Sequence, residues 1–151
     1  MANKKEFKND FSWSFSRHNT FNTCKRKYYY SYYGSWGGWN KDAEELSQKL
    51  YMLNKMTSLP MLAGSIVHDE VERTLKMLRY GRNADQNKSR DNVIKNFKQS
   101  WNQSKNKEWK DSPKWKTNLF EHYYNQKPSD ENLFELRDLM LNSIDGFFAS
   151  D

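Results

Sequence analysis

The sequence of 151 residues predicts a mainly helical fold. Apolar residues recur at intervals of three and four in several segments, which is the period of an amphipathic helix. No segment shows a sustained alternation with β-branched residues, and the three prolines stand near expected helix starts or in loops. At this length we expect residues 1–151 to form a single helical domain or fragment.

The first forty residues are expected to hold two short helices followed by a loop. Three serines are candidate caps of the first helix: Ser12, Ser14 and Ser16. A second, tyrosine-rich helix is expected to run to about Tyr33, before Gly34. The glycine-rich segment 34–39 is expected to be a loop, with Trp36 and Trp39 packing it onto the body.

Five further helices are expected after this loop. Residues 42–56 form the third, and residues 59–79 form the fourth, which Gly81 ends as a C-terminal cap. The fifth keeps helical spacing at Val93, Ile94, Phe97 and Trp101. A shorter sixth is indicated by Trp115, Leu119, Phe120 and Tyr123. The last is marked by Leu133, Leu136, Met140, Ile144 and Phe147.

The net charge of +6 is distributed unevenly along the chain. Residues 1–40 hold seven Lys/Arg against two acids, and residues 82–116 hold ten against four. Residues 129–151 hold one against six. Two basic blocks with interleaved aromatic residues favour a nucleic-acid partner, because phosphate neutralisation and base stacking supply most sequence-independent affinity. The alternative is an ordinary solvated surface.

The compartment is predicted from what the sequence lacks. Cys24 is the only cysteine, so an internal disulfide cannot form and nothing indicates an oxidising environment. The sequence shows neither a signal peptide nor an apolar stretch of about 18 residues. We therefore expect a cytoplasmic protein with no membrane partner.

The helix expected at 59–79 carries a candidate metal ligand. At about 100° per residue, its apolar face is predicted to hold Ala63, Val67, Val71, Thr74, Leu75 and Leu78. Gly64, His68 and Glu72 form a neighbouring stripe, which places His68 at the border of that face. Glycine inside a helix costs about 1 kcal/mol relative to alanine, so we expect another backbone to approach Gly64 closely. His68 is then either a half-buried, hydrogen-bonded histidine or a ligand of a divalent ion.

Two motifs in this order resemble the N-terminal motifs of the RecB-like branch of the PD-(D/E)XK nuclease superfamily. The first, within residues 12–33, is Ser14-x-Ser16-Arg17-x-x-x-Phe21-x-x-Cys24-x-Arg26-x-Tyr28-Tyr29. The second, within residues 59–80, is Ala63-Gly64-x-x-x-His68-x-x-x-Glu72. The resemblance implies that His68 is a ligand of a catalytic Mg²⁺ or Mn²⁺ and that DNA phosphodiesters are hydrolysed. It gives Gly64 and Glu72 a supporting role.

The sequence departs from this family pattern in two respects. Relatives that bind an iron–sulfur cluster use additional cysteines, and here Cys24 stands alone, so we expect no cluster. The family's aspartate and Glu-x-Lys signature lie on adjoining strands. The two Glu-x-Lys triplets here, Glu6-Phe7-Lys8 and Glu108-Trp109-Lys110, lack a flanking strand pattern. We therefore expect the catalytic sheet to be absent from this chain.

The sequence as a whole predicts the helical N-terminal region of an α/β PD-(D/E)XK-type nuclease, with the remaining catalytic residues expected beyond Asp151. By itself the chain should fold and should not cut DNA. DNA is the expected partner, and a helicase or another repair or defence protein is left open. Candidate DNA contacts are Arg17, Lys25, Arg26, Lys27 and Tyr29, although Ser16 and Arg17 can instead cap a helix and form an ion pair. The alternative function is a non-catalytic helical DNA-binding or protein-adaptor module.

Overall fold

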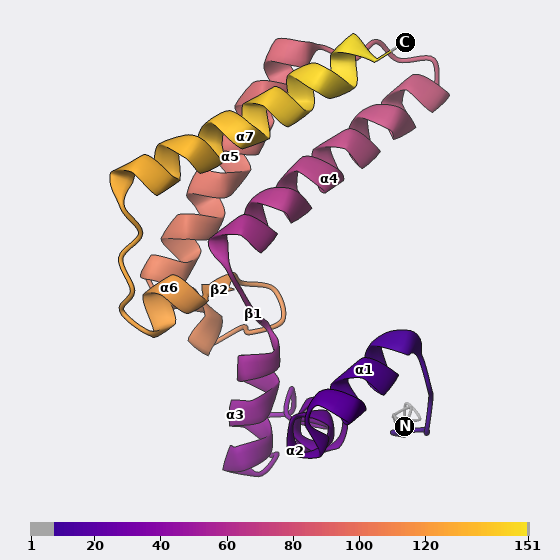
Figure 1. Cartoon of the computed structure of the whole chain (residues 1–151), viewed down its shortest axis with the longest axis vertical. Coiled ribbons are helices and arrows are strands. Elements are labelled where there is room, and N and C mark those ends of the chain that lie inside the picture. Colours follow the sequence, from indigo (N-terminus) through magenta and orange to yellow (C-terminus); the bar gives the residue numbers. More distant parts are fainter. Residues whose placement is uncertain (1–7, 151) are drawn as a thin grey trace, which may run out of the picture. The chain divides into compact units, whose positions relative to one another are not determined.

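The computed structural model describes residues 8–150 and is mainly helical, as the sequence predicts (Figure 1). Its contacts separate two compact units, with the boundary between Lys55 and Met56. The single domain expected from the sequence stays a prediction. Among residues 8–150, no helix combines the length and the apolar character needed to cross a bilayer.

The first unit contains short helices, and the first two are capped at their N-termini by side chains. The Ser14 hydroxyl accepts a hydrogen bond from the Arg17 amide at 3.3 Å and begins α1 (Phe15–Thr23). Cys24 Sγ accepts from the Lys27 amide at 3.4 Å and begins α2 (Lys25–Tyr29). One turn of π-helix, η1 (Tyr30–Gly34), continues α2 to the predicted glycine. The third helix, α3 (Glu45–Asn54), is shorter at both ends than predicted.

Tyr28 is the centre of the first unit. Its side chain is buried, and four aromatic rings surround it at centroid distances of 5.1 to 6.1 Å: those of Trp13, Phe21, Tyr32 and Tyr33. Aromatic rings in such tilted and edge-to-face arrangements add about 0.5–1.5 kcal/mol per pair beyond the buried area. The tyrosine-rich helix is therefore anchored by one tyrosine, while its neighbour Tyr29 remains 56% exposed.

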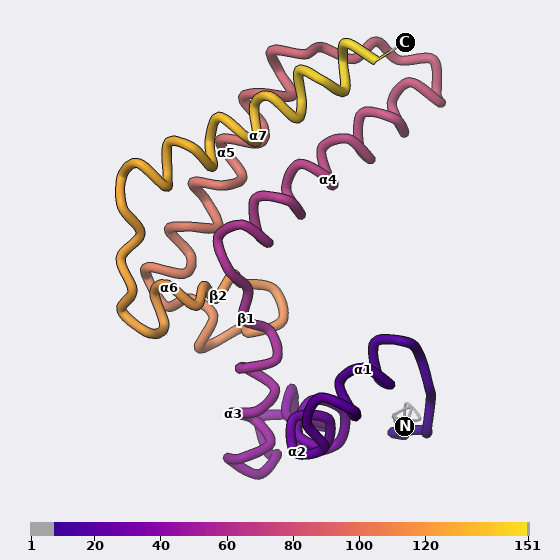
Figure 2. The backbone as a smooth tube through the Cα atoms, in the orientation of Figure 1, coloured from indigo at the N-terminus to yellow at the C-terminus, as the bar shows by residue number. Residues whose placement is uncertain are grey.

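Three long helices form the second unit, and each packs against the other two (Figures 1 and 2). These are α4 (Leu59–Arg79), α5 (Gln86–Lys105) and α7 (Asp130–Ala149). Each begins at a polar cap, namely Ser58, Asp85 or Ser129, whose side chain accepts an amide hydrogen bond. Buried residues of the three helices form one core together with Leu119, which lies outside them. The core residues are Leu59, Leu62, Ala63, Ile66, Val93, Leu119, Met140, Leu141 and Ile144.

Helix α4 ends as the sequence predicts. Gly81 has a φ of +69°, the left-handed conformation that glycine adopts without steric cost. Its amide bonds to the carbonyl of Leu78 at 2.9 Å, and the Arg82 amide bonds to that of Met77 at 3.0 Å. These two bonds form a Schellman motif, which satisfies carbonyl groups at the helix end.

Two short strands pair within the second unit. β1 (Met56–Thr57) pairs in parallel with β2 (Asn118–Leu119), with Met56 opposite Asn118. The predicted sixth helix is shortened by this pairing to α6 (Phe120–Tyr123), so Trp115 lies outside it and is exposed. A 3-10 turn, η2 (Glu108–Lys110), lies between α5 and β2. Residues 8–150 thus contain a single ladder of two residues per strand in place of a larger sheet.

Candidate functional site

Helix α4 faces the core with a different side from the one predicted. Its buried residues are Leu59, Leu62, Ala63, Ile66, Glu70 and Thr74. Leu75 and Leu78, which were expected in the core, are 52% and 48% exposed. The buried face is rotated by roughly a quarter turn from the predicted one, because Leu62, Ile66 and Glu70 belong to it in place of Leu75 and Leu78. Gly64, His68 and Glu72 consequently face outward from the helical unit.

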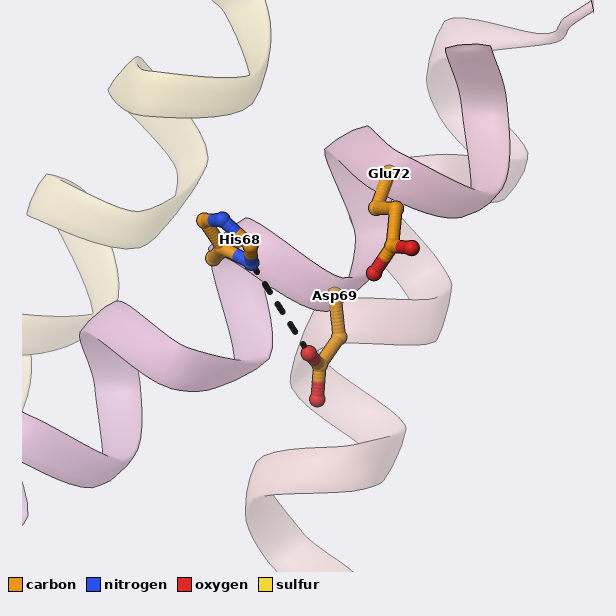
Figure 3. A group of neighbouring side chains, drawn as sticks. All are labelled: His68, Asp69 and Glu72. Atoms are coloured by element: carbon orange, nitrogen blue, oxygen red, sulfur yellow. Dashed lines mark ion pairs between the residues drawn. The ribbon is translucent and has the colours of Figure 1, made fainter. Parts of the chain in front are cut away.

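His68, Asp69 and Glu72 form a group of potential metal ligands on this outward face (Figure 3). Each offers one ligand atom, and these atoms all lie within 4.8 Å of one another. His68 Nδ1 lies 4.0 Å from Asp69 Oδ1, and both side chains are almost four-fifths exposed. The predicted border position of His68 is therefore wrong, and so is the alternative of a half-buried, hydrogen-bonded histidine. Its role as a metal ligand stays a prediction.

Asp69 is the member of this group that neither of the two motifs includes. The signal was present, because residues three and four apart on a helix are surface neighbours. Asp69 precedes Glu72 by three residues, and His68 precedes it by four. Helical spacing thus gathers all three side chains around one turn of α4.

Gly64 is not explained by close packing in this structure. A Cβ atom added at Gly64 would meet nothing within 4 Å. A close approach that requires glycine occurs instead at Gly38 in the first unit, where an added Cβ would lie 2.1 Å from the backbone oxygen of Ser47 and 2.7 Å from the Cβ of Tyr51. The close backbone approach predicted at Gly64 is therefore wrong for the described residues.

Glu72 is charged and already has a partner. The Lys76 ammonium donates to its carboxylate and, together with the smaller effect of His68, lowers the pKa of Glu72 below its ordinary value. A bound cation would have to compete with Lys76 for this oxygen. Glu72 is thus either a metal ligand itself or the residue that holds the Lys76 ammonium next to the other two donors.

The donor set of the group fits a divalent ion whose coordination is completed by water or by other ligands. One imidazole and two carboxylates supply three donors, whereas Mg²⁺ requires near-octahedral coordination and keeps several waters. Imidazole suits transition metals and carboxylates suit Mg²⁺ and Mn²⁺, so the mixed set favours Mn²⁺. All three donors come from a single helix and are exposed, which predicts weak binding by the group alone.

The candidate DNA contacts lie in the first unit. Lys25, Arg26 and Lys27 of α2 are exposed, as is Tyr29 at the end of the same helix. Their ammonium, guanidinium and ring groups are available for phosphates and bases. The structure therefore brings four of the five candidates together on α2, and we call Lys25, Arg26, Lys27 and Tyr29 the α2 basic surface.

Arg17 is engaged within the first unit. Its Nη1 donates to the carbonyl of Ser12 at 2.6 Å, and its guanidinium lies 4.4 Å from the centroid of the Tyr32 ring. Within residues 8–150, Arg17 forms these two contacts and not the predicted ion pair. The capping residue of α1 is Ser14, while the Ser16 hydroxyl lies 3.0 Å from that of Ser14.

Neither Glu-x-Lys triplet lies on a described strand. Glu6 and Phe7 are outside the described residues. Glu108, Trp109 and Lys110 form η2, where the Glu108 carboxylate lies 3.1 Å from Lys116 Nζ. The Trp109 side chain is buried, so this triplet packs η2 against the rest of the second unit.

The structure thus defines a helical protein with a candidate divalent-metal group on its longest helix. The sequence model of the PD-(D/E)XK nuclease superfamily matches residues 12–139, so the chain belongs to this superfamily and holds a nuclease-like domain. The superfamily predicted from the two motifs is confirmed, while the RecB-like branch stays a prediction. No curated protein and no solved structure matches the chain.

Proposed function

We propose that the chain is the helical part of a divalent-metal-dependent DNA nuclease of the RecB-like branch, in which His68 is a metal ligand. The observation that carries this proposal is the superfamily match over residues 12–139, which spans the helix bearing His68. The three adjacent donor atoms on the outward face of α4 support it.

Each residue of the group has a distinct part in this proposal. The His68 imidazole and the Asp69 carboxylate would hold a divalent ion, and Glu72 would keep Lys76 next to them or bind the ion itself. A divalent ion bound there would supply Lewis acidity toward a phosphodiester. Lys76 adds a positive charge beside the group, which favours the approach of a phosphate.

Metal binding by the 151-residue chain tests the role of His68. Mn²⁺ is titrated into the protein and bound ion is followed by calorimetry or by relaxation of water protons. We expect weak binding that His68→Ala abolishes. His18→Ala is the matched control, since His18 is also exposed on a helix but bonds to Asn22 at 2.8 Å. Equal loss in both variants would refute the metal-ligand role.

DNA cleavage separates the nuclease from the alternative of a non-catalytic binding module. In residues 8–150 the metal donors come from one helix, and the only ladder is two residues long. We therefore expect this chain by itself to bind DNA in a salt-dependent manner without cutting it in Mn²⁺. Adding a polypeptide that carries the superfamily's aspartate and Glu-x-Lys residues should produce cleavage with the native chain and not with the His68→Ala variant. No cleavage in either case would favour the binding module.

A further inference from the structure

A cavity of about 570 Å³ lies in the second unit, and none of its lining residues belongs to α4. Its walls come from the C-terminal end of α5, η2, α6, the segment after α6 and the first turn of α7. This volume is in the range of about 300–1,000 Å³ that is typical of small-molecule sites. None of its residues belongs to the His68 group.

The cavity has an excess of positive charge. Four lysines and two acids line it, and the lysines are Lys105, Lys107, Lys110 and Lys127. None of these four ammonium groups has a carboxylate within ion-pairing distance in residues 8–150. Glu121 Oε1 accepts from the Leu59 amide at 2.9 Å, while its Oε2 is buried and has no hydrogen-bond partner among the described residues. Asp130 lies in the first turn of α7, where the helix dipole favours an acid. The lysines are therefore available to an anion.

Aromatic rings form another part of the wall. The Trp101 and His122 rings meet edge to face at a centroid distance of 4.4 Å, and the Tyr123 ring lies 5.8 Å from that of Trp109. His122 Nδ1 lies 2.9 Å from the Ser104 hydroxyl. Burial and the nearby Lys105 lower the pKa of His122 against the opposing effect of Glu121, so this ring is neutral near pH 7. Neutral flat rings beside lysines suit a ligand with both a flat ring and a negative charge.

Backbone strain is concentrated in the same wall. Among residues 8–150, two residues other than glycine have a positive φ: Lys107 at 58° and Asn125 at 54°. Both line the cavity. Asparagine tolerates this conformation, whereas lysine does so at a cost, and such residues often occur at binding sites. At Lys107 this conformation ends α5 with a lysine where a glycine is usual.

We propose that this cavity binds one nucleotide unit, with its phosphate among the four lysines and its base against Trp101, His122 and Tyr123. The chain's membership of a nuclease superfamily selects a nucleotide among aromatic anions. The proposal does not require His68 to bind a metal. The nucleotide is either the end of a DNA strand or a free mononucleotide, and both offer the same phosphate and base.

Calorimetry with the 151-residue chain in EDTA tests the chemical class of the ligand, and it is independent of the metal site. The probes are dAMP, deoxyadenosine and inorganic phosphate. We expect dAMP to bind about tenfold more tightly than either of the others, since stacking and charge both contribute. Equal affinity for dAMP and phosphate would overturn the base contact. Equal affinity for dAMP and deoxyadenosine would overturn the phosphate contact.

Charge-reversal variants test whether dAMP binds in this cavity. Lys110→Glu with Lys127→Glu should weaken dAMP binding at least about tenfold. The matched control is Lys95→Glu with Lys98→Glu, which changes two exposed lysines of α5 outside the cavity and should alter affinity less than about twofold. Circular dichroism checks that all variants are folded. Equal weakening in both pairs would overturn the assignment to this cavity.

A ring variant and two oligonucleotides complete the test. Tyr123→Leu should reduce dAMP affinity and leave that for phosphate unchanged, and a parallel loss of both would contradict the base contact. Short oligothymidylates with and without a 5′ phosphate distinguish the sources. Preference for the phosphorylated strand supports a strand end, and binding of dAMP alone supports a free nucleotide. Failure of dAMP and both strands to bind would overturn the proposal.

Discussion

The Glu70 carboxylate is buried in the second unit and receives a hydrogen bond of 2.8 Å from Arg73 Nε. Asn92 of α5 donates to the same carboxylate at 3.2 Å. Burial would by itself raise the pKa of Glu70, but the hydrogen bonds from Arg73 and Asn92 outweigh it and hold the pKa below the ordinary value. Glu70 therefore joins α4 to α5 in its charged form, on the side of α4 opposite His68.

Replacing Glu70 with glutamine should destabilise the protein. The variant keeps the shape of the side chain but loses the charged hydrogen bonds with Arg73, so we expect the free energy of unfolding to fall by about 1–3 kcal/mol. Urea unfolding followed by circular dichroism measures the change. Glu72→Gln is the matched control, because Glu72 forms an exposed pair with Lys76, and its effect should be much smaller. Similar losses in the two variants would contradict the role of Glu70.

The stability of the protein should fall in acid, partly because of Glu70. A carboxyl whose pKa is lower in the folded state binds fewer protons there than in the unfolded chain. Its contribution is complete above 4.5, the ordinary pKa, and is lost as the pH falls through the lower folded pKa. Melting temperatures between pH 3 and pH 7 should therefore show the gap between the native protein and Glu70→Gln narrowing below about pH 4.5. A constant gap would exclude this titration.

The ends of α4 could be predicted because local chemistry determines them. Gly81 ends α4 as predicted, and α4 has the predicted bounds, since a cap or a left-handed glycine acts within one turn. The short pairing of β1 with β2 could not be predicted. Two residues per strand leave no alternating pattern, and the partners are about sixty residues apart in the sequence.

The face of α4 was predicted wrongly because apolar residues occur around most of its circumference. Leu75 and Leu78 continue the apparent stripe but are exposed, whereas Glu70 is buried. Sequence hydropathy assigns Glu70 to the surface, and only its partners on α4 and α5 reverse that assignment. The spacing of His68 and Glu72 was still informative, because helical neighbours stay neighbours whichever face is buried.

Two glycine substitutions should have opposite effects on stability. Gly38→Ala places a Cβ against the backbone of Ser47 and should destabilise the first unit by about 1–3 kcal/mol. Gly64→Ala meets no atom within 4 Å and should stabilise α4 by up to about 1 kcal/mol, the difference in helix propensity. Thermal unfolding of the two variants measures both changes. Destabilisation by Gly64→Ala would reveal a close contact of Gly64 that this structure does not contain.

Removing the charges of the α2 basic surface should reduce the salt dependence of DNA binding. Each phosphate contact contributes about 0.9 to the slope of log affinity against log salt for duplex DNA. The triple variant Lys25→Ala, Arg26→Ala and Lys27→Ala should therefore lower this slope by about 2–3 and weaken binding similarly for all sequences. Fluorescence anisotropy of a labelled duplex at several salt concentrations measures the slope. The control replaces three other exposed lysines of the first unit with alanine, namely Lys41, Lys49 and Lys55. An equal reduction of the slope in the control would show that net charge, rather than the α2 basic surface, determines DNA affinity.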